Sequence, residues 1–123
     1  MKFTDEQKKQ IVRGFIKIFT RISNKEYQKR VWIEGKGSER DDFDDTVNDF
    51  FCECDSILEK HKKFGITENQ YELLVKFREA FKAFSDDNDY PEEFIESPEW
   101  QKIMEMAKEV LKAFNYTDHG KSL

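Results

Sequence analysis

Glycine, proline and cysteine are scarce in this chain. Its 123 residues include only five glycines, two prolines and two cysteines. The scarcity of helix-breaking residues favours long helices over many short strands joined by turns. Cys52 and Cys54 cannot form the disulfide framework of a small secreted domain, and two positions apart on a helix they point in nearly opposite directions. We therefore expect reduced thiols, which are typical of a cytoplasmic protein.

The chain also lacks long apolar runs and an excess of positive charge. No stretch approaches the roughly 20 apolar residues of a membrane-spanning helix, and residues 1–10 have no apolar stretch like that of a signal peptide. The 26 acidic residues outnumber the 21 basic ones, which gives a formal net charge of −5. Phosphate binding needs a basic face, so we expect no nucleic-acid partner and no membrane, whereas a basic protein suits this charge.

Aromatic and charged residues are abundant. Aromatic residues make up 15% of the chain, with 12 phenylalanines, and charged residues make up 38%. Disordered chains are poor in aromatic residues, so this composition indicates a folded domain with a phenylalanine-rich core and a highly charged surface. The length suits a single helical domain over residues 1–123, in which we expect residues 115–123 to be a frayed tail.

Apolar residues recur at helical spacing, and no stretch alternates convincingly with the period of a strand. Three capping boxes and one cap followed by proline mark helix starts: Thr4 with Gln7, Ser23 with Glu26, Thr67 with Gln70, and Ser97 with Pro98. The predicted helices cover residues 5–22, 24–33, 41–63, 68 to the SDDND stretch, and 98–114, with a short turn at 91–96. The expected fold is all-α, a compact antiparallel bundle of four to five helices.

Two acidic clusters have the spacing of metal-binding motifs. Residues 41–45 match the DDxxD pattern that binds magnesium-diphosphate, and residues 92–96 match the EExxE of small all-α nucleotide pyrophosphatases. The ExxD that follows EExxE in those enzymes is missing, and both clusters lie at expected helix starts, where carboxylates are favoured anyway. We expect no metal, no cofactor and no catalytic residue, with a small metal-dependent phosphohydrolase as the alternative. Its ligands would be Asp41, Asp42, Asp45, Glu92, Glu93 and Glu96.

The remaining candidate site is an acidic surface. With Phe43 facing the core, Asp45, Asp49, Asp55 and Glu59 fall on the opposite face of the third predicted helix. Along the first three turns, no lysine four residues away balances the acids. A second acidic block surrounds Tyr90, and an aromatic ring among acids is the composition expected where a basic protein docks. An ordinary solvated face is the competing interpretation. The predicted partner-binding residues are Asp45, Asp49, Asp55, Glu59, Asp86, Asp87, Asp89, Tyr90, Glu92 and Glu93.

Three stretches resemble the immunity proteins encoded beside bacterial toxins, including those of contact-dependent growth inhibition. They are residues 22–51 (ISNKEYQKRVWIEGKGSERDDFDDTVNDFF), 64–67 (FGIT) and 97–100 (SPEW). The resemblance implies a partner that is a secreted toxin domain, often a basic nuclease. It also implies inhibition by covering the toxin's active cleft with acidic groups that mimic phosphates. No catalytic residue carries over, and a structural or adaptor domain is a third interpretation.

Overall fold

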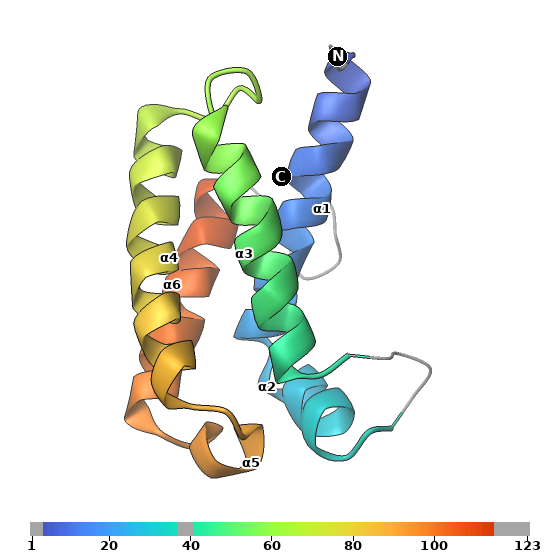
Figure 1. The fold of residues 1–123 in the computed structure, drawn as a ribbon, viewed down its shortest axis with the longest axis vertical. Helices are drawn as coiled ribbons and strands as arrows, with labels where there is room; N and C mark the ends of the chain where they lie inside the picture. Colours follow the sequence, from blue (N-terminus) through green and yellow to red (C-terminus); the bar gives the residue numbers. More distant parts are fainter. Residues whose placement is uncertain (1–3, 37–40, 115–123) are drawn as a thin grey trace.

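Four long antiparallel helices form an up-and-down bundle (Figure 1). The structure, a computed structural model, describes residues 4–36 and 41–114. The long helices are α1 (Asp5–Ser23), α3 (Phe43–Glu59), α4 (Glu68–Asp87) and α6 (Pro98–Ala113). Helices α3 and α6 each pack against both α1 and α4, so α1 and α4 lie across the bundle from each other. No strand occurs in the described ranges, and the all-α prediction is confirmed.

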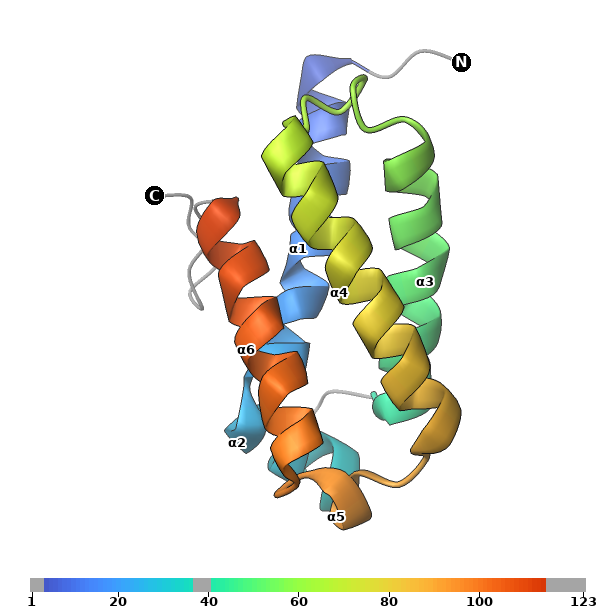
Figure 2. The same cartoon turned by 90° about the vertical axis from the view of Figure 1, so that its left-hand side faces the viewer.

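Three short helical segments cover one end of the bundle. They are α2 (Lys25–Tyr27), the π-helix η1 (Gln28–Ile33) and α5 (Pro91–Phe94). Helix α5 contacts η1, and both lie where α1 and α4 end and where α3 and α6 begin (Figures 1 and 2). We call this the closed end of the bundle. The two predicted acidic blocks lie at this end, one at the start of α3 and the other at the end of α4 and in α5.

Side-chain caps fix where the helices begin. Thr4 and Thr67 form the predicted capping boxes of α1 and α4, and Ser97 caps α6 ahead of its proline. The predicted Ser23 cap is wrong, because Asn24 accepts the hydrogen bond from the Tyr27 backbone N–H at 3.0 Å. Ser23 is still part of α1, and its hydroxyl donates to the Thr20 carbonyl instead.

The third helix is shorter than predicted. It ends at Glu59 rather than near Lys63, and residues 60–65 form successive turns. Gly65 has φ +73°, a left-handed conformation that glycine adopts without steric cost. The apolar pattern runs past the helix end because the His61 ring packs on Tyr71, with centroids 4.2 Å apart. The predicted frayed tail, residues 115–123, lies outside the described residues.

Aromatic rings fill the interior in two connected groups. Neighbouring rings lie mostly edge to face, at centroid distances of about 5 to 6 Å that favour aromatic pairs. The group in the middle of the bundle comprises Phe15, Phe19, Phe50, Phe77 and Phe81. The group at the closed end comprises Trp32, Phe43, Phe84, Phe94 and Trp100. Phe43 and Phe81 join the two groups, with centroids 6.2 Å apart.

One buried polar side chain connects α1, η1 and α6. Gln28 is fully buried, and its amide nitrogen donates to the carbonyls of Arg21 and Ile22 at 2.9 and 2.8 Å. Its side-chain oxygen accepts from Trp100 Nε1 at 2.9 Å. The last carbonyls of a helix have no intrahelical partner, and a buried unpaired polar group costs about 1–3 kcal/mol. Gln28 therefore satisfies the end of α1 and the indole of α6 at once.

We predict that Gln28→Ala lowers the free energy of unfolding by about 3 kcal/mol or more, because it removes the hydrogen bonds to the Ile22 carbonyl and the Trp100 indole N–H and leaves a void. Gln101→Ala is the matched control, since Gln101 is exposed and its side chain donates to Glu105 one turn farther along α6. That change should cost a few tenths of a kcal/mol. Urea denaturation measures both, and equal losses would show that Gln28 has no special role.

Candidate functional site

Asp41, the first residue of the DDxxD match, is a buried structural carboxylate. Its side chain is 8% exposed, and its Oδ2 accepts hydrogen bonds from the Tyr27 hydroxyl and Trp32 Nε1, each at 2.8 Å. The Thr46 hydroxyl donates to the same carboxylate at 3.0 to 3.1 Å, and Arg21 Nη1 lies 3.5 Å away. These contacts join α1, the α2–η1 segment and α3. The carboxylate therefore stabilises the closed end through these hydrogen bonds.

Two other residues of the motif matches, Asp42 and Glu96, also have structural partners. Asp42 caps α3 by accepting from the Asp45 backbone N–H at 2.7 Å. Glu96 pairs with Lys29 and Lys25 at 3.3 and 3.4 Å, and its hydrogen bonds with these lysines lower its pKa. Within residues 4–36 and 41–114, no group of three or more His, Cys, Asp or Glu side chains is placed to hold a metal ion. The fold does not assemble the DDxxD and EExxE matches into one site.

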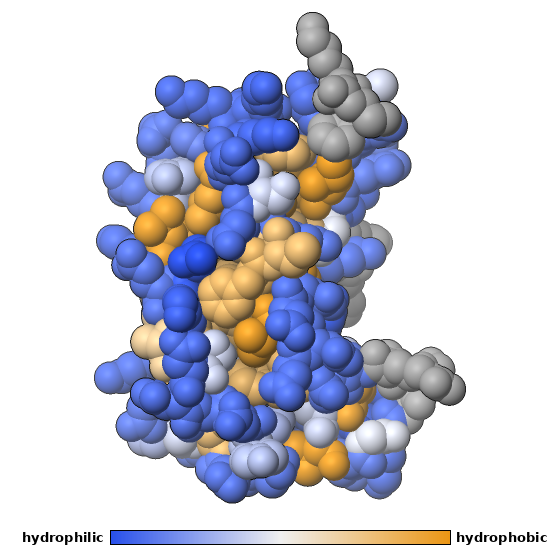
Figure 3. Space-filling view, in the orientation of Figure 1, coloured by the Kyte–Doolittle hydropathy of each residue, from blue (hydrophilic) through white to orange (hydrophobic). Residues whose placement is uncertain are grey.

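The acidic face of α3 is exposed, but the fold supplies bases that the local sequence lacks. Asp45, Asp49, Asp55 and Glu59 are all exposed. Arg78 of α4 bonds to Asp55 at 2.7 Å, and Arg21 of α1 lies 3.6 Å from Asp49. Apolar side chains also reach the surface near the middle of α3 and along its seam with α4 (Figure 3). The face is therefore less uniformly acidic than its sequence indicates.

Two long stretches without a basic residue meet at the closed end. Residues 41–59 contain eight acidic residues and residues 83–101 contain seven, and neither stretch has a lysine or arginine. Phe43 of the first stretch packs on Phe94 and Trp100 of the second, with ring centroids 4.8 and 5.9 Å apart. The start of α3, the end of α4 and α5 are consequently neighbours (Figures 1 and 2). The sequence shows two separate acidic blocks, and the fold brings them together.

The carboxylates at the start of α3 repel one another. The charge on Asp42 is the main cause that raises the pKa of Asp45 above its ordinary value of 3.8, and Asp41, Asp49 and Asp44 act in the same direction. A raised pKa means that the fold disfavours the ionised form of Asp45. The start of a helix normally favours carboxylates. The negative charge here is therefore greater than helix stability requires.

The acidic residues at the end of α4 oppose helix stability more directly. Asp86 and Asp87 lie in the last turn, which contains no basic residue, and carboxylates there interact unfavourably with the helix dipole. Asp86 is paired with Lys82 at 2.8 Å, but Asp87 has no ion pair within the described part of the chain. Tyr90 follows with 59% of its surface exposed, and Asp89, Glu92 and Glu93 around it are also exposed.

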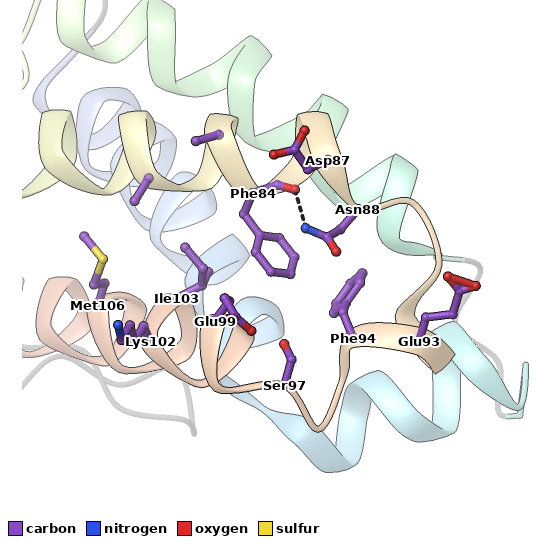
Figure 4. A pocket seen from close by; sticks show the side chains of 12 residues that line it. Phe84, Asp87, Asn88, Glu93, Phe94, Ser97, Glu99, Lys102, Ile103 and Met106 are labelled. Carbon is purple, nitrogen blue, oxygen red and sulfur yellow. Dashed lines mark hydrogen bonds between the residues drawn. The ribbon is translucent and has the colours of Figure 1, made fainter.

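The structure also contains a groove that sequence reasoning missed. It lies between α4 and α6 beside α5 and encloses about 570 Å³ (Figure 4). Phe84, Phe94 and Ile103 form much of its floor, and three of the acidic residues of the closed end line it: Asp87, Glu93 and Glu99. The one available signal was the pair of small side chains Ala80 and Ala83, which face this groove from α4.

Both cysteines are free thiols on opposite sides of α3, as predicted. Cys52 is exposed, and Cys54 is fully buried in the core. Burial raises the pKa of the Cys54 thiol to about 12, which keeps it protonated and unreactive at neutral pH. His61 contacts the Leu58 carbonyl and Glu68, each at 3.3 Å, at the turn between α3 and α4. These contacts give Cys54 and His61 structural roles.

Comparisons with protein-family models, with curated proteins and with solved structures find no match to this chain. None of the helices in the described ranges combines the length and the apolar character needed to cross a membrane. The function therefore has to be inferred from the surface that the fold creates.

We predict that Asp45→Asn raises the melting temperature at neutral pH, because it removes the repulsion from Asp42 that raises the Asp45 pKa. The ionised carboxylate destabilises the fold above its raised pKa. This penalty fades as the pH falls through that pKa, and it is absent well below 3.8. Asp55→Asn should instead lower the melting temperature at neutral pH, since it breaks the pair with Arg78. Denaturation across this pH range tests both signs, and a loss of stability in Asp45→Asn at neutral pH would contradict the repulsion.

We predict that Asp41→Ala lowers the free energy of unfolding by about 3 kcal/mol or more, because it removes the acceptor of the Trp32 indole N–H and of the buried Thr46 hydroxyl.

We also predict that magnesium, manganese or calcium raises the melting temperature of the wild-type protein little. The Asp41 carboxylate already accepts hydrogen bonds from Tyr27, Trp32 and Thr46. A tight site would give a rise equivalent to about 2.7 kcal/mol at a hundredfold excess of metal over Kd. Such a rise, lost in Asp45→Asn, would support the phosphohydrolase instead.

Proposed function

We propose that this chain is a cytoplasmic inhibitor that binds a basic protein, in the manner of the immunity proteins that neutralise bacterial toxin domains. The observation that carries the proposal is the junction of the two base-free acidic stretches through Phe43, Phe94 and Trp100. A basic partner would meet both stretches at the closed end together. Covering a cationic active cleft with these carboxylates would exclude its phosphate-bearing substrate.

The placement of individual acids favours a partner over a merely solvated face. Neighbouring carboxylates raise the pKa of Asp45, and Asp87 opposes the dipole of α4 without an ion pair in the described chain. Both charges therefore weaken the isolated fold. A cationic partner would reverse that effect, because it would neutralise the charges when it docks. Function at the expense of stability is common where a surface has to bind.

The closed end is also suited to binding because it is rigid. Phe43 and Trp100 are buried beneath the acidic surface, and Gln28 and Asp41 satisfy the polar groups of the adjoining elements. A surface that is ordered before it binds loses little conformational entropy on association. The backbone that carries the acids is therefore held in one arrangement, which favours a specific basic partner over non-specific polycations.

The phosphohydrolase alternative gains no support from the geometry. Asp41 accepts hydrogen bonds from Tyr27, Trp32 and Thr46, and Glu96 is held by two lysines. A metal-binding carboxylate needs free oxygen atoms that face a cavity. The acidic residues left for a metal are exposed ones on separate helices.

We predict that the double variant Asp45→Lys with Asp87→Lys lowers the association rate with a basic toxin domain about tenfold at low ionic strength, because the two charges steer the partner to the closed end. The loss should shrink as salt is added. The probe is an inactivated toxin domain encoded beside this chain, with rates measured by stopped flow. Protection of cells that co-express the active domain should fall in parallel.

The matched control for this prediction is Glu6→Lys with Glu109→Lys, which changes the net charge equally at exposed positions near the opposite end of the bundle. It should slow association much less. If both double variants slow association equally, only the net charge matters and the closed end is not the binding site. Circular dichroism of each variant verifies that the fold is retained.

A further inference from the structure

The groove between α4 and α6 is an apolar opening in the surface of the bundle. Its floor contains Phe84, Phe94 and Ile103, which are only 8, 3 and 5% exposed, together with the partly exposed Met106. Figure 4 shows the side chains of Phe84 and Phe94 at its centre, with Met106 toward one end and Glu93 toward the other. The groove has a volume of about 570 Å³, which is within the range of small-molecule pockets and therefore leaves room for one bulky apolar side chain.

Side-chain size explains why this seam is open. Ala80 and Ala83 occupy the side of α4 that borders α6, where larger side chains would fill the space. At the opposite seam of the same helix, with α3, long side chains meet instead: the guanidinium of Arg78 lies 5.4 Å from the Phe51 ring centroid and also binds Asp55. Helix α4 thus has large side chains at its seam with α3 and small ones where it borders the groove.

The groove is formed before anything binds. The Asn88 side-chain amide donates to the Phe84 carbonyl at 2.9 Å, which fixes the end of α4 (Figure 4). The Phe84 and Phe94 rings pack edge to face with centroids 4.9 Å apart, which holds α5 against α4. Ser97 caps α6 at the same place by accepting from the Trp100 backbone N–H at 3.1 Å. An incoming side chain would not have to order these elements.

The rim of the groove carries three acids and one base. Asp87 and Glu93 lie toward the α5 end, Glu99 lies near Ser97, and Lys102 lies farther along α6 (Figure 4). A second copy of this chain, with its net charge of −5, would be repelled by such a rim. A segment that combines a bulky apolar side chain with neighbouring lysines or arginines matches both the floor and the rim.

We propose that this groove holds an anchoring apolar side chain of the basic partner, with basic residues on either side of it placed against Asp87, Glu93 and Glu99. The inference rests on the proposed function, because it identifies where the partner of that function is bound. Buried aromatic or aliphatic anchors at the centre of an interface contribute most of its binding energy. The groove would therefore control how long the partner stays bound, whereas the surrounding charge controls how fast it arrives.

The first test uses a synthetic lysine-rich peptide with one central tryptophan, and a matched peptide with serine in place of the tryptophan. We expect the tryptophan peptide to shift the backbone amide resonances of Ala80, Ala83 and Lys102 in nitrogen-15 NMR spectra, and the serine peptide to bind about tenfold more weakly or worse. Equal binding of the two peptides, or shifts confined to other parts of the chain, would overturn the proposal.

Filling the groove provides a matched pair of variants. Ala83→Phe places a ring in the groove from an exposed position and should raise the Kd of the tryptophan peptide about tenfold. Gln10→Phe adds the same ring at an exposed position in the first half of α1, a helix that does not line the groove, and should leave the Kd unchanged. If Ala83→Phe lowers the melting temperature, Met106→Ala removes an apolar contact of the groove without adding volume and should also weaken binding. Unchanged affinity in both groove variants would refute the anchor.

The same variants separate this inference from the proposed function. With an inactivated toxin domain, Ala83→Phe should raise the dissociation rate and leave the association rate and its salt dependence unchanged. If the domain binds and Ala83→Phe dissociates at the wild-type rate, the groove inference fails and the proposed function stands. If the domain does not bind the wild-type chain, the proposed function fails, and the peptide experiment still decides what the groove binds.

Discussion

Phe43 directs its ring into the closed end of the bundle, where it contacts one aromatic ring from each of four other elements. The partners are Trp32, Phe81, Phe94 and Trp100, at centroid distances between 4.8 and 6.2 Å. Burying a phenylalanine side chain contributes about 1.5–3 kcal/mol, and each well-placed aromatic pair adds about 0.5–1.5 kcal/mol. Apolar packing at Phe43 thereby holds together elements whose surfaces carry charge of one sign. Its contacts with Phe94 and Trp100 bring the carboxylates of α3 close to those around α5.

Two buried polar side chains complete this arrangement and give it a single geometry. Apolar packing has little directionality, whereas hydrogen bonds require particular partners. Gln28 ties the end of α1 to Trp100, and Asp41 ties the start of α3 to Tyr27 and Trp32. Both networks pass through the α2–η1 segment. The π-helical turn of this segment buries Gln28, Val31 and Trp32 together.

The features that could be predicted from sequence depend on near neighbours in the chain. The capping boxes at Thr4 and Thr67 need only a residue three positions away, and the exposure of the acidic residues on α3 follows from helical period. The missed features depend on residues brought together from afar. Arg78 lies 23 positions from Asp55 in the sequence. The groove exists because Ala80 and Ala83 are on the side of α4 that borders α6. Periodicity reveals which side of a helix is buried, but it does not reveal how well two helices fill the space between them.

Charge and apolar surface act over different distances, and the closed end has both. Exposed charges act over about 8–10 Å at physiological salt, whereas apolar groups interact only at contact. A basic protein approaching this end would first respond to the acids of residues 41–59 and 83–101, and only after docking to the floor of the groove. Asp87 and Glu93 border the groove and belong to the second acidic stretch, so attraction and contact would converge on one place. In the proposed complex, acids that lower the stability of the free protein would direct the partner to the groove. That groove is open because α4 has small side chains there.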